Sequence, residues 1–477
     1  MAEYRKGKKV DPRAGLTDCE ERAGLTREQA EAHACGGTPP PPPKPGPIKG
    51  RHRALGIAAA AVVGGILLLI VLAVALSGGG DGSSKGKSSE THAAAPPPPR
   101  SPGDAANLWI DADGGSCSRS IDPTAYSDPA ACSSFAAAYS ASSGGDTVRI
   151  KAGSYNGPQS VGSQTKTPVV NFIGEDGTTV VTTHDTQLNG LAVVGNATVS
   201  NVNVGGDMPF VFIGRDNSTW RDSRLLAAYT GPDTTRIRGG FHGATPEPIL
   251  IYGDHEDDPY EHLALVNVVV EPQRACCTAH LESVRIDQNV SDVLIDRVTF
   301  LPTGPEGDNT ARLFITHPGG ASYPRNITIR NSVFFAAGGS YSIDGGAGAP
   351  CSFTFAYNTF AQERNISCNP GGSVLWVGNV GPKSSNGIAC TPNTTWRKNA
   401  WQWDGDPRVC SGEAANETWL NGSRYSISAA GLDSNYRPLP GAAVIDKGEA
   451  SCITQDRDGN PRPVGAACDA GAFERQG

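Results

Sequence analysis

A short motif recurs along the chain after residue 165, and it constrains the fold more than any other feature of the sequence. In each copy, an apolar residue is followed by four mostly polar residues, often including Asn or Asp, and then by a second apolar residue. The copies run from Val199 to Val204, Trp220 to Leu225, Leu265 to Val270, Ile295 to Phe300, Ile329 to Phe334, Phe355 to Phe360 and Trp396 to Trp401, with a looser copy at Trp376 and Asn379. Several neighbouring copies begin about 20 residues apart, and strands and turns of that period indicate a β-solenoid.

In a solenoid of this kind, the apolar side chains of each coil point inward and stack on those of the next coil. Asn at the turns tolerates left-handed backbone geometry and can hydrogen-bond from coil to coil. The main alternative is a β-sandwich, which needs longer runs of alternating residues and paired hairpin turns. Few such hairpins are visible in the sequence, so the solenoid is the favoured prediction.

A capping helix is expected before the first full coil. Asp128 followed by Pro129 suits a helix start, because Asp is a good N-cap residue and Pro is favoured at the first helical position. The helix would run to about Ser142, with one face made by Cys132, Phe135, Ala136 and Tyr139. Such a helix would cover strand edges that the first coil leaves unpaired.

Residues 54–77 are predicted to form one transmembrane helix. No charged or strongly polar side chain occurs from Leu55 to Leu76, and a helix of about 22 residues rises about 33 Å, which matches the hydrocarbon core of a bilayer. A buried helix of a soluble domain is the alternative, whereas a signal peptide is disfavoured by the 50 or so residues before the run. Basic residues precede the run at Lys44, Lys49, Arg51 and Arg53. The positive-inside rule therefore places the N-terminus in the cytoplasm.

Four regions follow from this topology. Residues 1–53 are predicted to be a disordered basic cytoplasmic tail, and residues 78–105 a Gly/Ser/Pro-rich linker. Residues 106–477 would form the extracytoplasmic β-helix domain. The expected location is therefore the cell membrane, crossed once, with the C-terminal domain outside.

Ten of the 12 cysteines lie beyond the predicted membrane segment, where disulfides can form. Pairing between sequence neighbours is the simplest pattern, and it gives Cys117–Cys132, Cys351–Cys368, Cys390–Cys410 and Cys452–Cys468. Cys276 and Cys277 remain, either as a vicinal bridge or paired elsewhere. A zinc site is the rival interpretation, although no pair with CxxC spacing supports it.

Both ends of the β-helix region carry motifs of a known family. The opening combines Trp109-Ile110-Asp111 with the segment from Gly145 to Tyr155, which reads GDTVRIKAGSY. The closing segments are Ile445 to Gly448, Asp456 to Pro463 (DRDGNPRP) and Cys468 to Glu474 (CDAGAFE). The opening resembles the entry coil of right-handed parallel β-helix proteins of the pectate-lyase-like superfamily, and the end is similar to the closing segment of the choice-of-anchor Q type. The resemblance implies an all-β, right-handed parallel β-helix, and it implies fold more strongly than function.

Strand alternation predicts which polar side chains share an outward face. Inward positions at Ile249, Ile251, Val284, Ile286, Leu313, Ile315 and Ile343 leave their neighbours pointing outward. The expected outward residues include Tyr252, Asp254, Arg285, Asp287, Arg312 and Asp344. Arginine pairs with uronate carboxylates in a bidentate manner, so this mixture suits an acidic polysaccharide. The competing interpretation is a solvated surface with weak ion pairs.

A candidate catalytic centre lies in the segment CTAHLESVR, from Cys277 to Arg285. It resembles the HxDxxQ-like strands of some bacterial β-helix proteins, with Glu282 at the Asp position and Arg285 in place of Gln. The resemblance makes His280, Glu282 and Arg285 candidates for catalysis, because lyases of this superfamily use Lys, Arg or His as the base. Arg312 joins them from the predicted outward face. Hydrolysis would instead need two carboxyl groups beside the glycosidic bond. Leu281 and Val284 are out of phase, so either the chain bends there or His280 turns inward.

Calcium is the one cofactor that the sequence suggests. The acidic run from Asp254 to Asp258 offers Asp254, Asp257 and Asp258 as oxygen ligands, with a solvated loop as the alternative. The segment from Asp456 to Asn460 lacks EF-hand spacing and is predicted to be a turn.

Three functions remain open at this point. The first is a membrane-anchored surface protein whose β-helix binds a polysaccharide, and the second is an active polysaccharide lyase or glycoside hydrolase on the same scaffold. The third is a structural or adhesin module with a protein partner of unknown identity. The net charge of −8 argues against nucleic acid as a partner, because phosphate binding needs a basic face.

Overall fold

A computed structural model describes residues 105–162, 164–182, 190–206, 210–229, 248–254, 258–274, 281–302, 309–316, 323–335, 341–345, 352–361, 365–366, 372–382, 394–403, 417–421 and 430–477. Within these ranges no helix is both long enough and apolar enough to cross a bilayer. The predicted transmembrane segment, 54–77, and the predicted tail lie outside the described residues.

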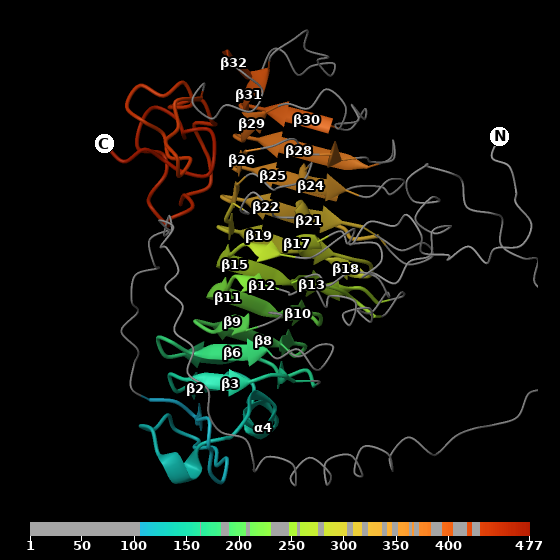
Figure 1. Ribbon diagram of the computed structural model, residues 1–477, viewed down its shortest axis with the longest axis vertical. Coiled ribbons are helices and arrows are strands. Elements are labelled where there is room, and N and C mark those ends of the chain that lie inside the picture. Colours follow the sequence, from blue (N-terminus) through green and yellow to red (C-terminus); the bar gives the residue numbers. More distant parts are fainter. Residues whose placement is uncertain are drawn as a thin grey trace, which may run out of the picture. The chain divides into compact units, whose positions relative to one another are not determined.

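The described chain forms a parallel β-helix of stacked coils, whose strands lie on three faces (Figure 1). The first face contains β1 (Leu108–Ile110), β2 (Thr147–Ile150), β5 (Val170–Gly174), β8 (Ala197–Ser200), β11 (Thr219–Leu225), β15 (Ala264–Val270), β19 (Leu294–Asp296), β22 (Ile327–Arg330), β25 (Ser352–Ala356), β28 (Ser373–Val377) and β30 (Thr394–Arg397). Strands β11 and β15 continue into the second face. All the paired strands named here run parallel to their neighbours.

The second and third faces complete each coil. The second contains β3 (Ser154–Asn156), β6 (Thr179–Thr182), β9 (Asn203–Gly206), β20 (Thr299–Phe300), β23 (Val333–Phe334), β26 (Thr359–Phe360), β29 (Val380–Pro382), β31 (Ala400–Trp403) and β32 (Thr418–Asn421). The third is an eight-stranded sheet of β4 (Gln159–Val161), β7 (Leu191–Val193), β10 (Val211–Ile213), β13 (Ile249–Ile251), β17 (Leu281–Ile286), β21 (Asn309–Ile315), β24 (Tyr341–Gly345) and β27 (Asn365–Ile366). Two short pairs lie outside these faces: β12 (Ala228–Tyr229) with β16 (Gln273–Arg274), and β14 (Tyr260–Glu261) with β18 (Val290–Ser291).

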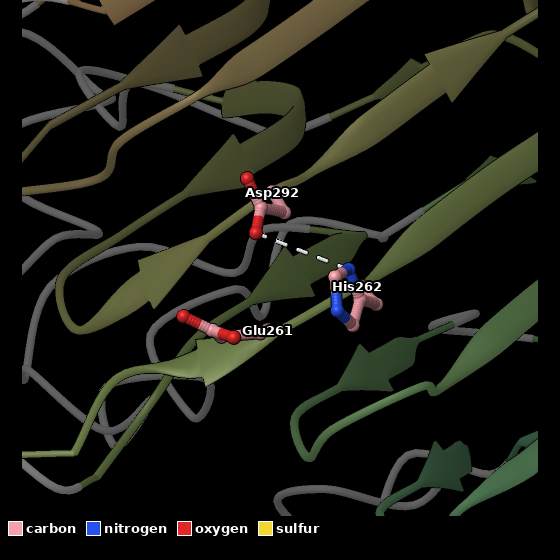
Figure 2. A group of neighbouring side chains, drawn as sticks. All are labelled: Glu261, His262 and Asp292. Atoms are coloured by element: carbon pink, nitrogen blue, oxygen red, sulfur yellow. Dashed lines mark ion pairs between the residues drawn. The ribbon is translucent and has the colours of Figure 1, made fainter.

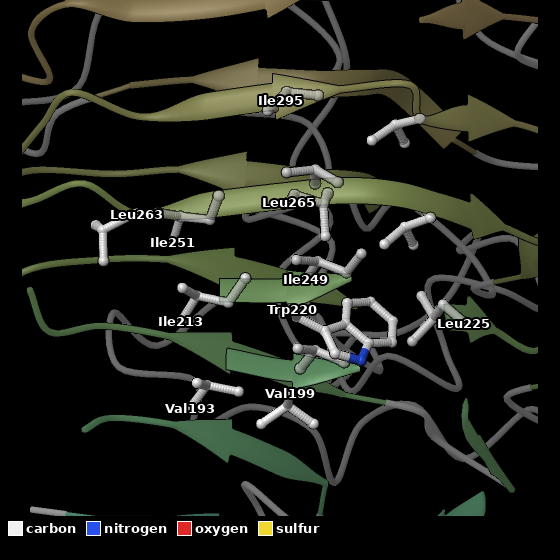
Figure 3. Packing of buried hydrophobic residues seen from close by; sticks show 14 of the residues in the cluster. Val193, Val199, Ile213, Trp220, Leu225, Ile249, Ile251, Leu263, Leu265 and Ile295 are labelled. Atoms are coloured by element: carbon white, nitrogen blue, oxygen red, sulfur yellow. The ribbon is translucent and has the colours of Figure 1, made fainter. Parts of the chain in front are cut away.

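One continuous row of inward side chains runs through the first face. Register places the following residues on consecutive strands: Leu108, Val148, Phe172, Val199, Trp220, Leu265, Ile295, Ile329, Phe355, Trp376 and Trp396. All are buried, and the ring centroids of Phe355 and Trp376 are stacked 4.1 Å apart. Figure 3 shows Trp220 among the aliphatic side chains of neighbouring coils. The predicted cylinder of stacked apolar residues is therefore confirmed.

The turn inside each motif has a constant geometry. Its third residue adopts a positive φ in every copy, at Asn201, Asp222, Asn267, Arg297, Asn331, Tyr357, Gly378 and Lys398. Asn and Gly tolerate this left-handed region best, which explains why Asn is frequent in the motif. The expected hydrogen bonds from coil to coil also occur, because Asn379 Oδ1 accepts from the backbone N–H of Asn358 at 3.0 Å and Asn399 Oδ1 accepts from that of Asn379 at 2.9 Å.

The predicted capping helix exists, but its predicted start was wrong. Residues Asp128–Ala130 form a single 3-10 turn, η1, and the α-helix α4 spans Phe135–Ala141, with the Ser134 hydroxyl accepting from the Ala137 N–H. The reason is that the Cys132 N–H donates to the Trp109 carbonyl at 2.7 Å, so this stretch pairs with β1 instead of coiling. Phe135, Ala138 and Tyr139 form the buried face, whereas Ala136 is exposed.

Two of the four predicted disulfides lie within the described residues, and both form: Cys117–Cys132 and Cys452–Cys468. The cysteines of the other two pairs, together with Cys276 and Cys277, lie outside them.

The C-terminal segment, residues 430–477, packs on turns and strands of several coils. Arg457 is 8% exposed, and its guanidinium donates to Thr299 Oγ1 at 2.7 Å and to Asn267 Oδ1 at 3.1 Å. The predicted turn at Asp456 is confirmed, because the Asp456 N–H donates to the Asn460 carbonyl at 2.9 Å. The family-like closing motif thus has a structural role, as a segment that ties neighbouring coils together.

Candidate functional site

The outer surface of the eight-stranded sheet holds the best described group of predicted site residues. Ile251 is in register with Ile286, so Tyr252 and Asp287, which follow them, lie beside each other on neighbouring coils. Arg285 is in register with Phe314 on β21, and Phe314 with Asp344 on β24. The register therefore places three of the predicted residues, Tyr252, Arg285 and Asp287, at neighbouring outward positions.

Hydrogen bonds and one ion pair link these three positions. The Arg285 guanidinium lies 3.0 Å from Asp287 Oδ2, with side chains that are 16% and 1% exposed. Asp287 Oδ1 accepts from the Gln288 N–H at 2.8 Å, and Gln288 Nε2 donates to the Tyr252 hydroxyl at 3.2 Å. An ion pair this well shielded from water is stronger than a surface pair, so the competing interpretation of a freely solvated face does not describe this part of the sheet.

Beside this network lies a hollow of about 140 Å³. Its lining residues are Val194, Phe212, Gly214, Arg215, Tyr252, Asp254 and Tyr260. The rings of Phe212 and Tyr252 are 6.4 Å apart, and the Tyr260 hydroxyl donates to Asp254 Oδ1. Aromatic walls next to one basic and one acidic side chain give a site with an apolar surface and charged hydrogen-bonding groups.

Both tyrosines of the hollow remain protonated over the ordinary pH range. Burial raises the pKa of Tyr260 to about 12, and its hydrogen bond to Asp254 acts in the same direction. Burial also raises the pKa of Tyr252. Their hydroxyl groups are thus available as neutral hydrogen-bonding groups, and a role as a general base near neutral pH is disfavoured.

The sequence indicated only part of this hollow. Tyr252 and Asp254 were predicted as binding residues, but Phe212, Arg215 and Tyr260 were missed. Phe212 lies on β10, in register with Leu250, and its outward parity could have been read from the buried Val211 and Ile213. Tyr260 lies on β14, a two-residue strand that is not part of the repeated motif and could not be predicted from it.

Arg312 shares the outward parity of Phe314, yet it is only 1% exposed. Outward parity therefore does not make this side chain accessible to solvent. Burial lowers the pKa of the Arg312 guanidinium to about 10, because a charged group is disfavoured away from water.

Glu282 does not join the outward group. It precedes Val284 by two residues on β17 and is in register with Ala311, so it has the parity of the inward positions, and it is 4% exposed. The register shifts between Leu281 and Glu282, which accounts for the phase break noted in the sequence. His280 lies outside the described residues.

The calcium prediction is only partly covered, since Asp257 lies outside the described residues while Asp254 and Asp258 are exposed. Among described side chains, two groups have oxygen or nitrogen atoms close enough together to hold a cation. They are Glu261, His262 and Asp292, shown in Figure 2, and Asp111, Asp113 and Asp128. His262 Nδ1 and Asp292 Oδ2 are 3.9 Å apart, and both side chains are substantially exposed. Neither group includes a predicted calcium ligand.

Comparisons with known proteins find structural likeness only. No protein-family model matches the chain, and no curated protein matches it. A crystal structure of pectate lyase Pel9A is 15% identical, with 77% of this chain and 96% of that chain covered and a TM-score of 0.37. XylC in complex with xylose is 8% identical, with 68% and 64% covered and a TM-score of 0.39.

A tailspike protein, gp49 of Acinetobacter baumannii bacteriophage Fri1, described as a capsular polysaccharide depolymerase, is 13% identical, with 58% and 57% covered and a TM-score of 0.31. The chain thus spans less than two thirds of XylC and of the tailspike protein. All three TM-scores lie below 0.5, so the parallel β-helix assignment rests on the strand pairing described above.

Proposed function

We propose that this chain is a membrane-anchored surface protein whose β-helix binds an acidic polysaccharide on the outer surface of the eight-stranded sheet. The observation that carries the proposal is the hollow in which Phe212, Tyr252 and Tyr260 lie beside Arg215 and Asp254. Aromatic rings pack well against the apolar faces of sugar rings. Arg215 would pair with a uronate carboxylate, and Asp254 would accept hydrogen bonds from sugar hydroxyls.

The repetition of the fold supports a polymeric ligand. Outward positions on β10, β13, β17 and β21 repeat from coil to coil about 4.8 Å apart, the ordinary spacing of paired strands. A chain of sugar units can therefore contact equivalent positions on several coils. The buried Arg285–Asp287 pair, one coil beyond Tyr252, would orient hydrogen-bonding groups along the same line.

Membrane anchoring is the second part of the proposal. It is supported by the uncharged run from Leu55 to Leu76 and by the basic residues before it. An anchor of this kind would hold the β-helix at the cell surface, where envelope or environmental polysaccharides are present. Fractionation of cells, followed by protease treatment of intact cells, tests this placement.

Binding is tested by calorimetric titration of the purified chain with polygalacturonate, with and without Ca²⁺. We expect Arg215→Ala to weaken binding at least tenfold, because it removes a charge-assisted hydrogen bond of about 1.5–3 kcal/mol. Arg224→Ala is the matched control, since Arg224 is an arginine with a 29% exposed side chain on the second face, paired with Glu271. Equal losses in the two variants would count against the hollow as the binding site.

A second candidate function is an active polysaccharide lyase, which the resemblance of the segment from Cys277 to Arg285 implies. Arg312 is a poor base for it, because the side chain is 1% exposed and a pKa of about 10 leaves the guanidinium protonated near neutral pH. β-Elimination would remove the C5 proton of a uronate and leave an unsaturated sugar. New ultraviolet absorbance from such a product would establish the lyase, and its absence, alongside measurable binding, would leave the binding function.

A further inference from the structure

A second concave surface lies on a different face of the β-helix. It is a groove of about 360 Å³ along the outer side of the first face, and it extends over β19, β22, β25, β28 and β30. Its volume falls in the range of about 300–1,000 Å³ that is typical of ligand sites. From this groove we infer a second binding site, for a neutral, hydroxyl-rich oligosaccharide, that goes beyond the acidic-polysaccharide site proposed above.

The groove is built from two rows of outward side chains in consecutive coils. Register aligns the first row as Leu294, Thr328, Thr354, Leu375 and Thr395. The second row, two positions earlier along the coils, includes Asn326, Ser352 and Ser373. The Ser352 hydroxyl donates to Asn326 Oδ1 at 2.8 Å, so neighbouring polar groups are already oriented toward one another.

The chemistry of these rows selects an uncharged ligand. Hydroxyl and amide groups both donate and accept hydrogen bonds, as sugar hydroxyls do. The leucines at positions 294 and 375 add apolar surface on which a sugar ring can lie. Among the described residues that line the groove, Asp292 is the one charged side chain, and a single carboxylate disfavours polyanions such as polyuronates or nucleic acids.

An extended peptide is a poorer fit to the same surface. Peptides commonly dock by adding a strand to the exposed edge of a sheet. The groove lies on the face of strands such as β22 and β25, which are paired on both sides, so their backbone groups already have partners. Only side chains remain for recognition, and they repeat from coil to coil as the units of a sugar chain do.

The test is a calorimetric titration of the full-length chain, held in a sugar-free detergent, with cellohexaose, xylohexaose and mannohexaose. We expect at least one hexasaccharide to bind, and Thr354→Arg to weaken that binding at least tenfold by filling and charging the groove. Thr219→Arg is the matched control, because Thr219 lies in the same outward row on β11, outside the groove, and is expected to change the affinity less than twofold. Thr328→Arg gives an independent reading one coil earlier if Thr354→Arg unfolds.

The two binding sites can be distinguished in the same experiment. Thr354→Arg should leave the affinity for polygalacturonate unchanged, and Arg215→Ala should leave the affinity for the hexasaccharide unchanged. The inference is overturned if none of the three hexasaccharides binds, or if Thr354→Arg and Thr219→Arg change the affinity alike. Loss of polygalacturonate binding in Arg215→Ala bears only on the first site.

Discussion

Buried asparagines fix the turns of this β-helix at the residue scale. Asn379 has no exposed surface, and its side chain accepts from the Asn358 N–H and donates to the Phe355 carbonyl at 2.9 Å. Asn358 and Asn399 repeat the pattern on neighbouring coils. Each amide therefore satisfies backbone groups that a turn would otherwise bury without partners.

Replacing Asn379 tests this role. Asn379→Ala leaves a buried N–H and a buried carbonyl unsatisfied, so we expect the free energy of unfolding to fall by about 2–4 kcal/mol in denaturant titration. Asn171→Ala, on the half-buried outer side of β5, is the control and should change it by no more than about 0.5 kcal/mol. Similar losses of unfolding free energy in both variants would contradict this role of the buried asparagines.

Strand alternation predicted the orientation of some side chains of the third face and not of others. Alternation placed Ile249, Ile251 and Val284 inward correctly, because each is fully buried in a regular strand. It could not foresee that Arg312 is 1% exposed at a position of outward parity, since alternation along a strand does not show what lies over the outer surface of the sheet. It also could not assign Glu282, because the register shift beside it interrupts the alternation.

At the scale of elements, strands were easier to predict than helices. The strands follow from a repeated pattern, whereas α4 depends on Ser134 as its cap and on the pairing of Cys132 with β1. The C-terminal segment has no α-helix or strand to predict, and its buried carboxylates accept hydrogen bonds from the backbone of the same segment. Asp456 and Glu474, for example, accept several backbone N–H groups of the same segment.

Arg457 is expected to hold this segment on the coils. Arg457→Met keeps much of the apolar stem but leaves Thr299 and Asn267 without its hydrogen bonds, so unfolding free energy should fall by about 1–3 kcal/mol. Amide hydrogen exchange should accelerate mainly in residues 455–475. Lys447→Met, an exposed cation of the same segment, should leave exchange there unchanged. Unchanged amide hydrogen exchange in Arg457→Met would show that other contacts hold the C-terminal segment on the coils.

The whole molecule is organised by one apolar row that crosses all the described coils of the first face. That row was predictable, because a 20-residue period allows few other ways to bury apolar residues. The two concave surfaces were less predictable, since each combines side chains from several coils. The function of a parallel β-helix depends on the side chains of such surfaces, and the fold alone does not specify it.

The most direct test of the proposed polysaccharide site is a crystal structure of the protein soaked with an oligogalacturonate. We predict a sugar ring against Tyr252 and Tyr260, with its carboxylate paired to Arg215, in the hollow on the eight-stranded sheet. A ligand ordered elsewhere on the molecule while the hollow stays empty would contradict the proposed site.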